Sequence, residues 1–127
     1  MKKLVFYRCS HCGNVSIKLV DKKVPMFCCG EPMQELNANT MDAALEKHVP
    51  VVTVDGQNVE VLVGSVAHPM TEEHHIAFIV LQTNLGYQVK ELDHTGTPNA
   101  SFVLLKDEKC VAVYEYCNLH GLWAYNM

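Results

Sequence analysis

Two closely spaced pairs of cysteines near the start of the chain constrain its fold more strongly than any other feature. Two residues separate Cys9 from Cys12, whereas Cys28 and Cys29 are adjacent and follow after fifteen further residues. Four thiolates brought together at such spacings form a tetrahedral site that selects zinc or iron, and the spacing leaves both metals open. The adjacent pair is unusual, because zinc ribbons separate the cysteines of both pairs. This part of the chain is therefore expected to fold around a metal.

The overall cysteine and histidine content also indicates metal ligation. The chain has six cysteines and seven histidines among 127 residues, and a formal net charge of −4. The apolar run at residues 4–7 is too short for the core of a signal peptide, so we expect the cytoplasm, where thiols stay reduced. No apolar run reaches the roughly 18 residues of a membrane-spanning helix, so no membrane partner is expected. The negative charge argues against a nucleic-acid partner.

The chain is expected to form two domains joined by a linker. Residues 1–36 hold four of the six cysteines, with short strands expected at 4–7 and 15–20. So small a domain has a poor apolar core, which a metal centre commonly supplements. Residues 37–47 are polar and alanine-rich, so we expect a linker with one helical turn after Thr40.

From His48 to the end, the sequence has the pattern of an antiparallel β-sandwich. Apolar and β-branched runs flank Asp55-Gly56, a dipeptide typical of a tight hairpin. Glycine and proline residues separate several of the later runs, and no long helical pattern is present. The expected strands cover residues 51–54, 57–63, 76–83, 87–92, 101–105 and 111–117. Short strands at this spacing are typical of two packed sheets.

Histidines accompany another cysteine in this second part of the chain. Cys117 and His120 are three positions apart, close enough for a thiolate and an imidazole to bind one metal. Other histidines fall at or beside the ends of expected strands, namely His48, His68 and His74. These residues predict a histidine-rich metal site around Cys117, separate from the four-cysteine site.

Six segments, in order along nearly the whole chain, resemble one known family. Residues 9–12 (CSHC) and 28–33 (CCGEPM) are similar to a desulforedoxin module. The later segments resemble superoxide reductases: residues 46–50 (EKHVP), 64–70 (GSVAHPM), 73–74 (EH) and 116–123 (YCNLHGLW). Together the six segments resemble the desulfoferrodoxin family, the two-iron form of superoxide reductase.

The resemblance implies a mainly β fold that carries two iron centres. A desulforedoxin-like domain at residues 1–36 would be followed by an immunoglobulin-like antiparallel β-sandwich at 48–127. The first iron would have four thiolate ligands, from Cys9, Cys12, Cys28 and Cys29. The second, catalytic iron would have four equatorial imidazoles and one axial thiolate, from His48, His68, His74, His120 and Cys117. Glu46 and Lys47, in a mobile loop at the end of the 37–47 linker, would lie over the open sixth position.

The implied reaction is the one-electron reduction of superoxide to hydrogen peroxide. A thiolate opposite the open position pushes electron density toward a bound oxygen species, as it does in haem proteins. Lys47 would attract the superoxide anion, and Glu46 would occupy the open position after oxidation. The resemblance further implies a small electron donor such as rubredoxin, a homodimer, and an anaerobic or microaerophilic source.

Several candidate residues have no role in this assignment. His11, His75, His94 and Cys110 lie off the ligand positions, and we interpret Cys110 as a small core residue. Phe78 occupies a place where the family often carries a tryptophan, which predicts different packing near the second site.

Two other classes of protein remain as alternatives. A cupredoxin-like copper protein also uses a β-sandwich and a cysteine, histidine and methionine near the C-terminus, which Cys117, His120 and Met127 would match. A non-catalytic zinc module would use the four cysteines as a structural centre and leave the histidines without a role. Four well-placed histidines exceed what copper needs, and neither alternative explains the segments after residue 46.

Overall fold

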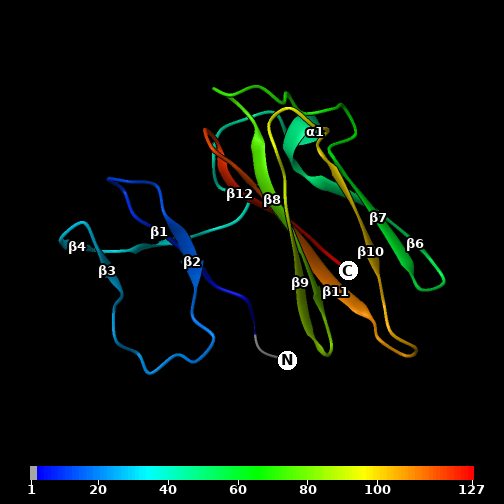
Figure 1. Cartoon of the computed structure of the whole chain (residues 1–127), viewed down its shortest axis with the longest axis horizontal. Coiled ribbons are helices and arrows are strands. Elements are labelled where there is room, and N and C mark those ends of the chain that lie inside the picture. The colour runs from blue at the N-terminus through cyan, green and yellow to red at the C-terminus, as the bar shows by residue number, and fades with distance from the viewer. Residues whose placement is uncertain (1–2) are drawn as a thin grey trace. The chain divides into compact units, whose positions relative to one another are not determined.

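The computed structural model describes residues 3–127, and its contacts divide the chain into two compact units (Figure 1). The first unit ends at Asn37 and the second begins at Ala38. Residues 38–47, which we expected to form a linker, are part of the second unit. Each unit is built from antiparallel strands.

The first unit contains a three-stranded sheet and a small hairpin. The sheet has β1 (Phe6–Arg8) between β2 (Val15–Ile17) and β5 (Gln34–Leu36). The hairpin pairs β3 (Phe27–Cys28) with β4 (Glu31–Pro32), which are two residues long each. Strands this short cannot bury much apolar surface, so the unit depends on other interactions for its stability.

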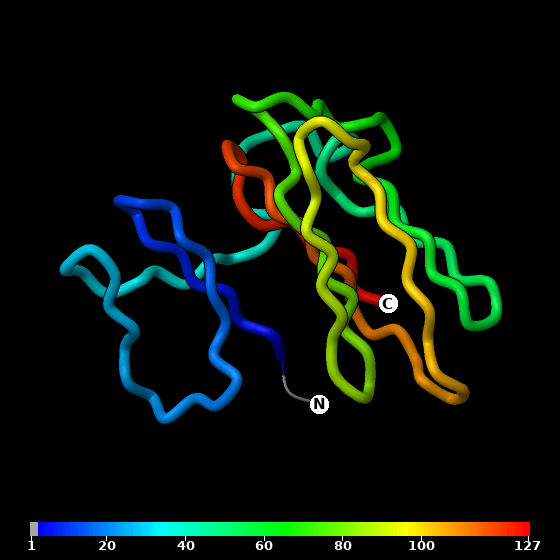
Figure 2. The backbone as a smooth tube through the Cα atoms, viewed as in Figure 1, coloured from blue at the N-terminus to red at the C-terminus, as the bar shows by residue number. Residues whose placement is uncertain are grey.

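The second unit consists of two antiparallel sheets, as the sequence predicts. One sheet has the strand order β10-β7-β6, and the other has the order β12-β11-β8-β9. The first sheet comprises β6 (Pro50–Asp55), β7 (Asn58–Val63) and β10 (Asn99–Val103). The second comprises β8 (Ile76–Thr83), β9 (Gly86–Glu91), β11 (Cys110–Cys117) and β12 (Gly121–Asn126). Figure 2 shows β6–β7 and β8–β9 as two long hairpins of this unit.

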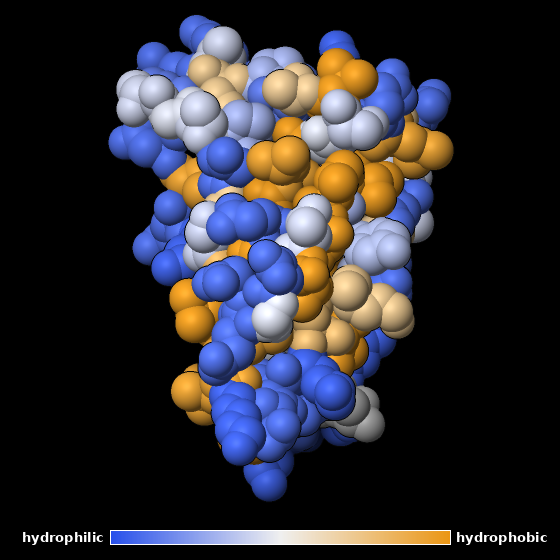
Figure 3. All heavy atoms as spheres, turned by 90° about the vertical axis from the view of Figure 1, so that its right-hand side faces the viewer, coloured by the Kyte–Doolittle hydropathy of each residue, from blue (hydrophilic) through white to orange (hydrophobic). Residues whose placement is uncertain are grey.

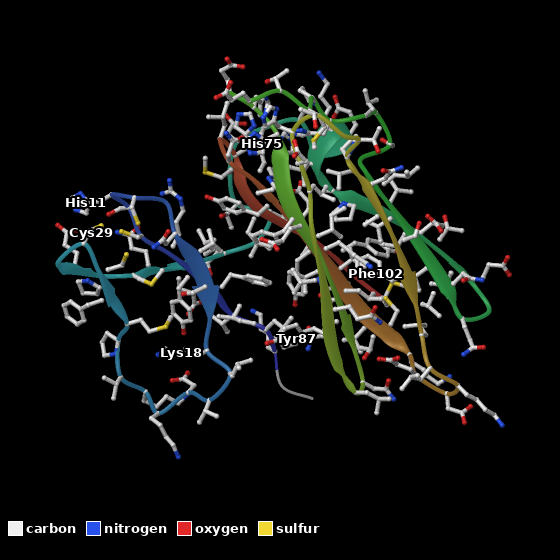
Figure 4. The ribbon with its side chains drawn as sticks, viewed as in Figure 1. His11, Lys18, Cys29, His75, Tyr87 and Phe102 are labelled. Atoms are coloured by element: carbon white, nitrogen blue, oxygen red, sulfur yellow. The ribbon has the colours of Figure 1, made fainter. Side chains whose placement is uncertain are left out.

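An apolar core unites the two sheets. Strand β7 alternates exposed and buried residues, and its buried side chains pack with those of β8, β10 and β11. Phe102 of β10, labelled in Figure 4, belongs to this core. The other fully or nearly fully buried members are Val59, Val61, Val63, Ile76, Ile79, Leu81, Leu104, Val113 and Cys117. Each buried Val, Ile or Leu contributes roughly 1.5–3 kcal/mol, so the sandwich has its own source of stability.

One short helix, α1 (Leu45–His48), precedes the sandwich among the described residues. Its flanking residues, Ala44 and Val49, both have extended backbone, and no side chain caps its N-terminus. A helix of four residues is not stable in isolation, so tertiary contacts must hold it in place.

Most of the strand predictions are confirmed, and the differences have local causes. β8 coincides with the predicted strand at 76–83. The predicted hairpin is confirmed, although Asp55 pairs with Asn58, so its two-residue loop begins at Gly56. The helical turn expected after Thr40 lies later, in α1. The apolar and polar patterns of the sequence do not predict β3, β4, β5 or β12. The first three strands are very short, and β12 overlaps residues 116–123, which we interpreted as a segment of metal ligands.

The surface of the second unit has exposed apolar side chains on the β10-β7-β6 sheet. Val51 and Leu62 are cross-strand partners on β6 and β7, and both are exposed, as is Val103 on β10. Figure 3 shows apolar side chains among polar ones on the side of the molecule where β6 and β7 lie. Within residues 3–127, no helix is long and apolar enough to cross a membrane.

Candidate metal centres

The first candidate centre brings together the four cysteines of the first unit. The sulfur atoms of Cys9, Cys12, Cys28 and Cys29 all lie within 4.8 Å of one another. Those of Cys12 and Cys28 are 3.5 Å apart. Tetrahedral coordination with metal–sulfur bonds of about 2.3 Å places sulfurs about 3.8 Å apart, so this spacing fits a metal ion. All six cysteines of the chain are free of disulfide bonds.

A tight turn after β1 positions the first two sulfurs. The backbone N–H of Gly13 donates to the Cys9 carbonyl (3.0 Å), and Gly13 has a φ of 82°, which suits glycine. Two backbone N–H groups point at sulfur, from Cys12 to Cys9 Sγ (3.5 Å) and from Asn14 to Cys12 Sγ (3.4 Å). The first of these contributes most to lowering the pKa of Cys9 to about 6. The turn therefore favours thiolate at this position.

The adjacent cysteines reach the same site because the chain reverses between them. Consecutive side chains of a strand point to opposite faces, and Cys28 is the last residue of β3. Cys29 has a φ of 53° and Gly30 a φ of 77°, so both lie in the left-handed region. This turn directs both sulfurs to one centre and explains how vicinal ligands are accommodated.

The electrostatics of the four thiols also fit a bound cation. Hydrogen bonding to Cys9, and then to the other two thiols, raises the pKa of Cys29 to about 12. The pKa of Cys28 is raised as well, mainly by hydrogen bonding to Cys12. Only a cation allows four thiolates to share so small a volume, and metal binding releases their protons.

The second candidate centre lies in the second unit and has five donor side chains. The ligand atoms of His48, His68, His74, Cys117 and His120 all lie within 4.8 Å of one another. His48 ends α1, His68 follows β7, His74 precedes β8, and Cys117 and His120 flank the turn between β11 and β12. All five predicted side chains are thus brought together from separate loops and strand ends.

The four imidazoles form a closed ring of edge-to-face neighbours. His48 contacts His68 and His120, and His74 completes the ring by contacting the same two residues. Ring centroids of neighbours are 4.6–5.0 Å apart, and their planes are inclined by 79–83°. Four donors in a ring suit a square arrangement around one ion rather than a tetrahedron.

Hydrogen bonds at the outer edge of the ring determine which nitrogens face inward. Nδ1 of His48 lies 2.7 Å from the Ala44 carbonyl, and Nδ1 of His68 lies 2.7 Å from the Pro69 carbonyl. A carbonyl only accepts, so each Nδ1 carries the proton and each Nε2 of the neutral ring presents a lone pair. These two Nε2 atoms are only 3.1 Å apart. Two lone pairs at this distance repel each other unless a cation lies between them.

The other donors are consistent with the same ion. Nδ1 of His120 lies 3.1 Å from His48 Nε2 and 3.9 Å from the Cys117 sulfur. Nε2 of His74 is buried and has no hydrogen-bond partner among the described residues. Metal–nitrogen bonds of about 2.1 Å at right angles place neighbouring nitrogens about 3.0 Å apart, which matches the spacing at His48.

For three of the four imidazoles, burial favours the neutral form that metals require. Desolvation lowers the pKa of His48 and His74, and it lowers the pKa of His68 to about 4. For Cys117, burial raises the pKa of the thiol, whereas the backbone N–H groups of Leu119 and His120 lower it. The N–H groups and a bound cation would together stabilise the thiolate.

Side chains outside the ring hold the donors in position. The indole of Trp123 donates from Nε1 to the His120 carbonyl (3.1 Å) and stacks on the His48 ring at 4.8 Å. Asn118 connects two loops, because it donates to the Glu73 carbonyl (2.9 Å) and accepts from the His75 backbone N–H (2.9 Å). The segment before β8 is thereby fixed against the turn after β11.

Glu46 and Lys47 lie beside this ring, on α1. Both side chains are exposed. The charge of Lys47 contributes to the lowered pKa values of His48 and His74, so its ammonium lies within electrostatic range of the site. The site therefore has one cation at its edge that could attract a small anion.

The histidines that we left without a role lie outside both centres. His11 pairs with Glu31 at 3.1 Å, and Figure 4 shows His11 near Cys29. His75 is turned away, since its Nδ1 is bonded to the Thr71 carbonyl (2.9 Å) and its ring lies 5.9 Å from that of His94.

Two further expectations concern packing. Cys110 is partly buried and packs against the sandwich core, in agreement with its interpretation as a core residue. Phe78 stacks on Tyr116, with ring centroids 5.6 Å apart. The different packing expected near the second site therefore involves an aromatic pair between β8 and β11.

Sequence reasoning did not identify Glu115 as a notable residue. Its side chain is fully buried in β11, and neither carboxylate oxygen has a hydrogen-bond partner among the described residues. Burial raises the pKa of Glu115 to about 9, so the carboxyl is neutral at pH 7. The signal was its position in a run of apolar and aromatic residues, because every residue from 112 to 117 of β11 is buried.

The copper alternative does not fit the arrangement of its proposed ligands. Met127 follows β12, whose residue Asn126 pairs with Ala112, whereas Cys117 pairs with Gly121 at the other end. Five residues of extended strand separate these ends by about 17 Å. Met127 is also 56% exposed, so it cannot be an axial ligand to a metal at Cys117.

Comparison with known proteins gives consistent matches. A family model described as desulfoferrodoxin matches residues 40–126. The desulfoferrodoxin of Syntrophotalea carbinolica is 46% identical over 123 residues, which cover 97% of this chain and 96% of that protein. The superoxide reductase of Pyrococcus furiosus is 36% identical over 104 residues, covering 61% of this chain and 84% of that protein. The crystal structure of the superoxide reductase from Treponema pallidum matches with a TM-score of 0.84 at 41% identity, covering 98% of this chain and all of that one.

Proposed function

Because the chain belongs to the desulfoferrodoxin family, we propose that it is a superoxide reductase, an enzyme that reduces superoxide to hydrogen peroxide at its histidine-rich site. The closed ring of four buried or half-buried imidazoles beside the Cys117 sulfur is the observation that carries this proposal. Neither copper nor structural zinc needs four imidazoles in a ring together with a thiolate.

The ring and the thiolate are suited to a single iron ion. His48, His68, His74, His120 and Cys117 would hold it, because their ligand atoms all lie within 4.8 Å of one another. An iron(II) ion bound by these residues would supply the one electron that superoxide needs. The neutral imidazoles leave the ring without charge of its own, and the thiolate adds electron density to the site. Two protons from solvent complete the balance from superoxide to hydrogen peroxide.

Two residues of α1 have proposed roles in the same reaction. Lys47 attracts the superoxide anion to a chain whose net charge of −4 would otherwise repel it. Its ammonium can also stabilise the negative charge that develops on oxygen as superoxide gains one electron. Glu46, one position earlier, would occupy the open position after oxidation and close the site until it is reduced again.

We infer that the four-cysteine centre of the first unit also holds iron, giving two iron ions per chain. Residues 1–36 would form this desulforedoxin-like domain, 37–47 the linker and active-site loop, and 48–127 the catalytic sandwich. A cytoplasmic location is proposed as well, because thiols stay reduced in that compartment. A small redox protein such as rubredoxin would supply electrons, and the exposed apolar side chains on the β10-β7-β6 sheet are compatible with a homodimer.

The proposal is tested by mixing the reduced protein with superoxide and following both products. We expect superoxide consumption that depends on a reductant and yields hydrogen peroxide without dioxygen. Stoichiometric dioxygen release would instead indicate a dismutase. His74→Ala should abolish the reaction, and His75→Ala is its matched control, because the adjacent imidazole lies outside the ring. Metal analysis should find about two irons per chain, whereas copper or zinc as the native metal would contradict the proposal.

A further inference from the structure

The loop that follows β7 lies unusually close to the backbone of α1. A Cβ atom added to Gly64 would lie 2.6 Å from the Glu46 carbonyl oxygen, 3.0 Å from that of Val49 and 3.1 Å from the Lys47 carbonyl carbon. All three are backbone atoms, which cannot rotate away as a flexible side chain can. Gly64 is therefore required by close approach of two chain segments.

The same loop also hydrogen-bonds to α1. The backbone N–H of Val66 donates to the Glu46 carbonyl (2.9 Å), and the Ser65 hydroxyl donates to the same oxygen (3.3 Å). The last carbonyls of a helix have no partner within it, so these donors satisfy a group that the short helix leaves unpaired. Residues 64–66, which we call the clasp, thus hold the helix at its centre.

This attachment matters because little else can fix the backbone of Glu46 and Lys47. The helix is a single turn, its flanking residues are extended, and it has no side-chain cap. The side chains of Glu46 and Lys47 are exposed, so packing does not hold them either. Their positions relative to the imidazole ring are set by His48 on one side and by the clasp on the other.

We propose that the clasp positions the Glu46–Lys47 turn at the edge of the histidine site, and that Gly64 and Ser65 are positioning residues for the reaction with superoxide. This inference rests on the proposed function and extends it. Gly64 allows the turn to approach, and the two hydrogen bonds to the Glu46 carbonyl hold it there. When the clasp is weakened, the turn moves outward and the Lys47 ammonium no longer acts at the site.

The test begins with Gly64→Ala in the iron-loaded protein. We expect the second-order rate constant with superoxide to fall by about tenfold, similar to the loss of one steering charge. Gly96→Ala is the matched control, because a Cβ there meets a single atom, the Asp93 carbonyl oxygen at 3.3 Å. Iron content and the visible spectrum are measured in parallel, since the loop of the clasp continues into His68, whose N–H donates to the Val63 carbonyl.

A double-mutant cycle with Lys47→Ala separates positioning from a general structural effect. If the clasp acts through Lys47, Gly64→Ala should change the rate by less than about twofold in the Lys47→Ala background. The dependence of the rate on ionic strength should weaken in Gly64→Ala as it does in Lys47→Ala. Independent, multiplied losses in the double variant would overturn the proposal.

Ser65→Ala provides a milder second variant in case Gly64→Ala does not fold. Amide hydrogen exchange of residues 44–49, measured on the iron-loaded protein, should become faster in Ser65→Ala and return toward wild type in Ser65→Thr, which keeps the hydroxyl. Unchanged exchange in Ser65→Ala would contradict the clasp. These results do not depend on catalysis: a wild-type protein that fails to consume superoxide refutes the proposed function, whereas the exchange data judge the clasp alone.

Discussion

At the residue scale, the placement of a single proton on each imidazole decides which nitrogen can bind a metal. The carbonyls of Ala44 and Pro69 each accept from an Nδ1, and this leaves the two Nε2 lone pairs of His48 and His68 facing each other at 3.1 Å. Outer hydrogen bonds of this kind orient ligands and select their tautomer. These hydrogen bonds thus fix which nitrogens face the ion, and a bound cation would offset the repulsion between the lone pairs.

The charge of Lys47 gives the first prediction at this scale. Lys47→Ala should slow the reaction with superoxide by about tenfold, because the site loses its attraction for the anion. Iron content should not change, since Lys47 is not a ligand. Rapid mixing at several ionic strengths measures this effect, and Lys47→Arg, which keeps the charge, serves as the control. An unaltered rate constant in Lys47→Ala would remove this residue from the proposed role.

The buried carboxyl of Glu115 gives a prediction about pH. Its pKa of about 9 in the folded chain is above the ordinary value of 4.5. The unfolded chain therefore loses this proton at lower pH than the folded chain does, and the Glu115 contribution to stability falls as pH rises from about 5 to 9, by up to roughly 1.4 kcal/mol per pH unit.

Glu115→Gln removes this titration and should make stability less dependent on pH. The free energy of unfolding of both proteins is measured by denaturant at several pH values. The value for the variant minus the value for the wild type should increase as pH rises from 5 to 9. Glu91→Gln, at an exposed position on β9, is the control. Its free energy of unfolding should depend on pH in the same way as that of the wild type. A constant difference between Glu115→Gln and the wild type would show that the carboxyl does not titrate in this range.

At the scale of elements, β12 joins the histidine-rich site to the sheet. It begins just after His120. Its residue Trp123 stacks on the His48 ring and donates a hydrogen bond to the His120 carbonyl. One strand therefore supports two ligands that are 72 residues apart in the sequence. This support is independent of the metal and depends on complete burial of the indole.

We accordingly expect Trp123→Phe to destabilise the second unit. The smaller ring leaves a cavity and an unpaired carbonyl, which together cost about 1–3 kcal/mol. Unfolding should be followed by circular dichroism, because Trp123 is the single tryptophan of the chain. Tyr125→Phe, two positions along the same strand and 45% exposed, should cost little. Equal costs for the two variants would show that the indole hydrogen bond and packing are unimportant.

At the scale of the whole molecule, the two units differ in what stabilises them. Within residues 3–37, the buried side chains are those of Leu4, Phe6 and Cys9, whereas the sandwich has a large apolar core. A domain with so few buried side chains needs another source of stability, and metal binding can provide it as folding free energy.

This difference predicts that loss of the first metal unfolds one unit and spares the other. Cys29→Ser should lose about one metal per chain, and hydrogen exchange of residues 3–37 should become fast. Exchange in β7, β8 and β11 should remain slow, and the prereduced variant should still react with superoxide. Ser10→Ala, between the first two cysteines, is the control. Persistent protection of residues 3–37 without metal would contradict this view of the first unit.

Much of this structure was predictable from short patterns of residues. Cysteine spacing indicated the first centre, and alternation of apolar and polar residues indicated the strands of the sandwich, because both depend on chain geometry over a few residues. The Asp55-Gly56 turn was likewise a local signal. The positions of His48 and His68 beside expected strands made them candidates, and the family resemblance assigned them as ligands.

Only the tertiary structure decided how those residues meet. The ring order of the four imidazoles and the clasp at Gly64 depend on contacts between segments distant in sequence. The left-handed backbone of Cys29, which unites adjacent sulfurs, is a conformation that the residue type does not indicate. Glu115 is similar, because its neutrality follows from burial between sheets and not from its neighbours along the chain. The sequence by itself determined which chemical groups the protein has and which strands present them. Their convergence required folding, since close approach and desolvation are properties of the packed chain.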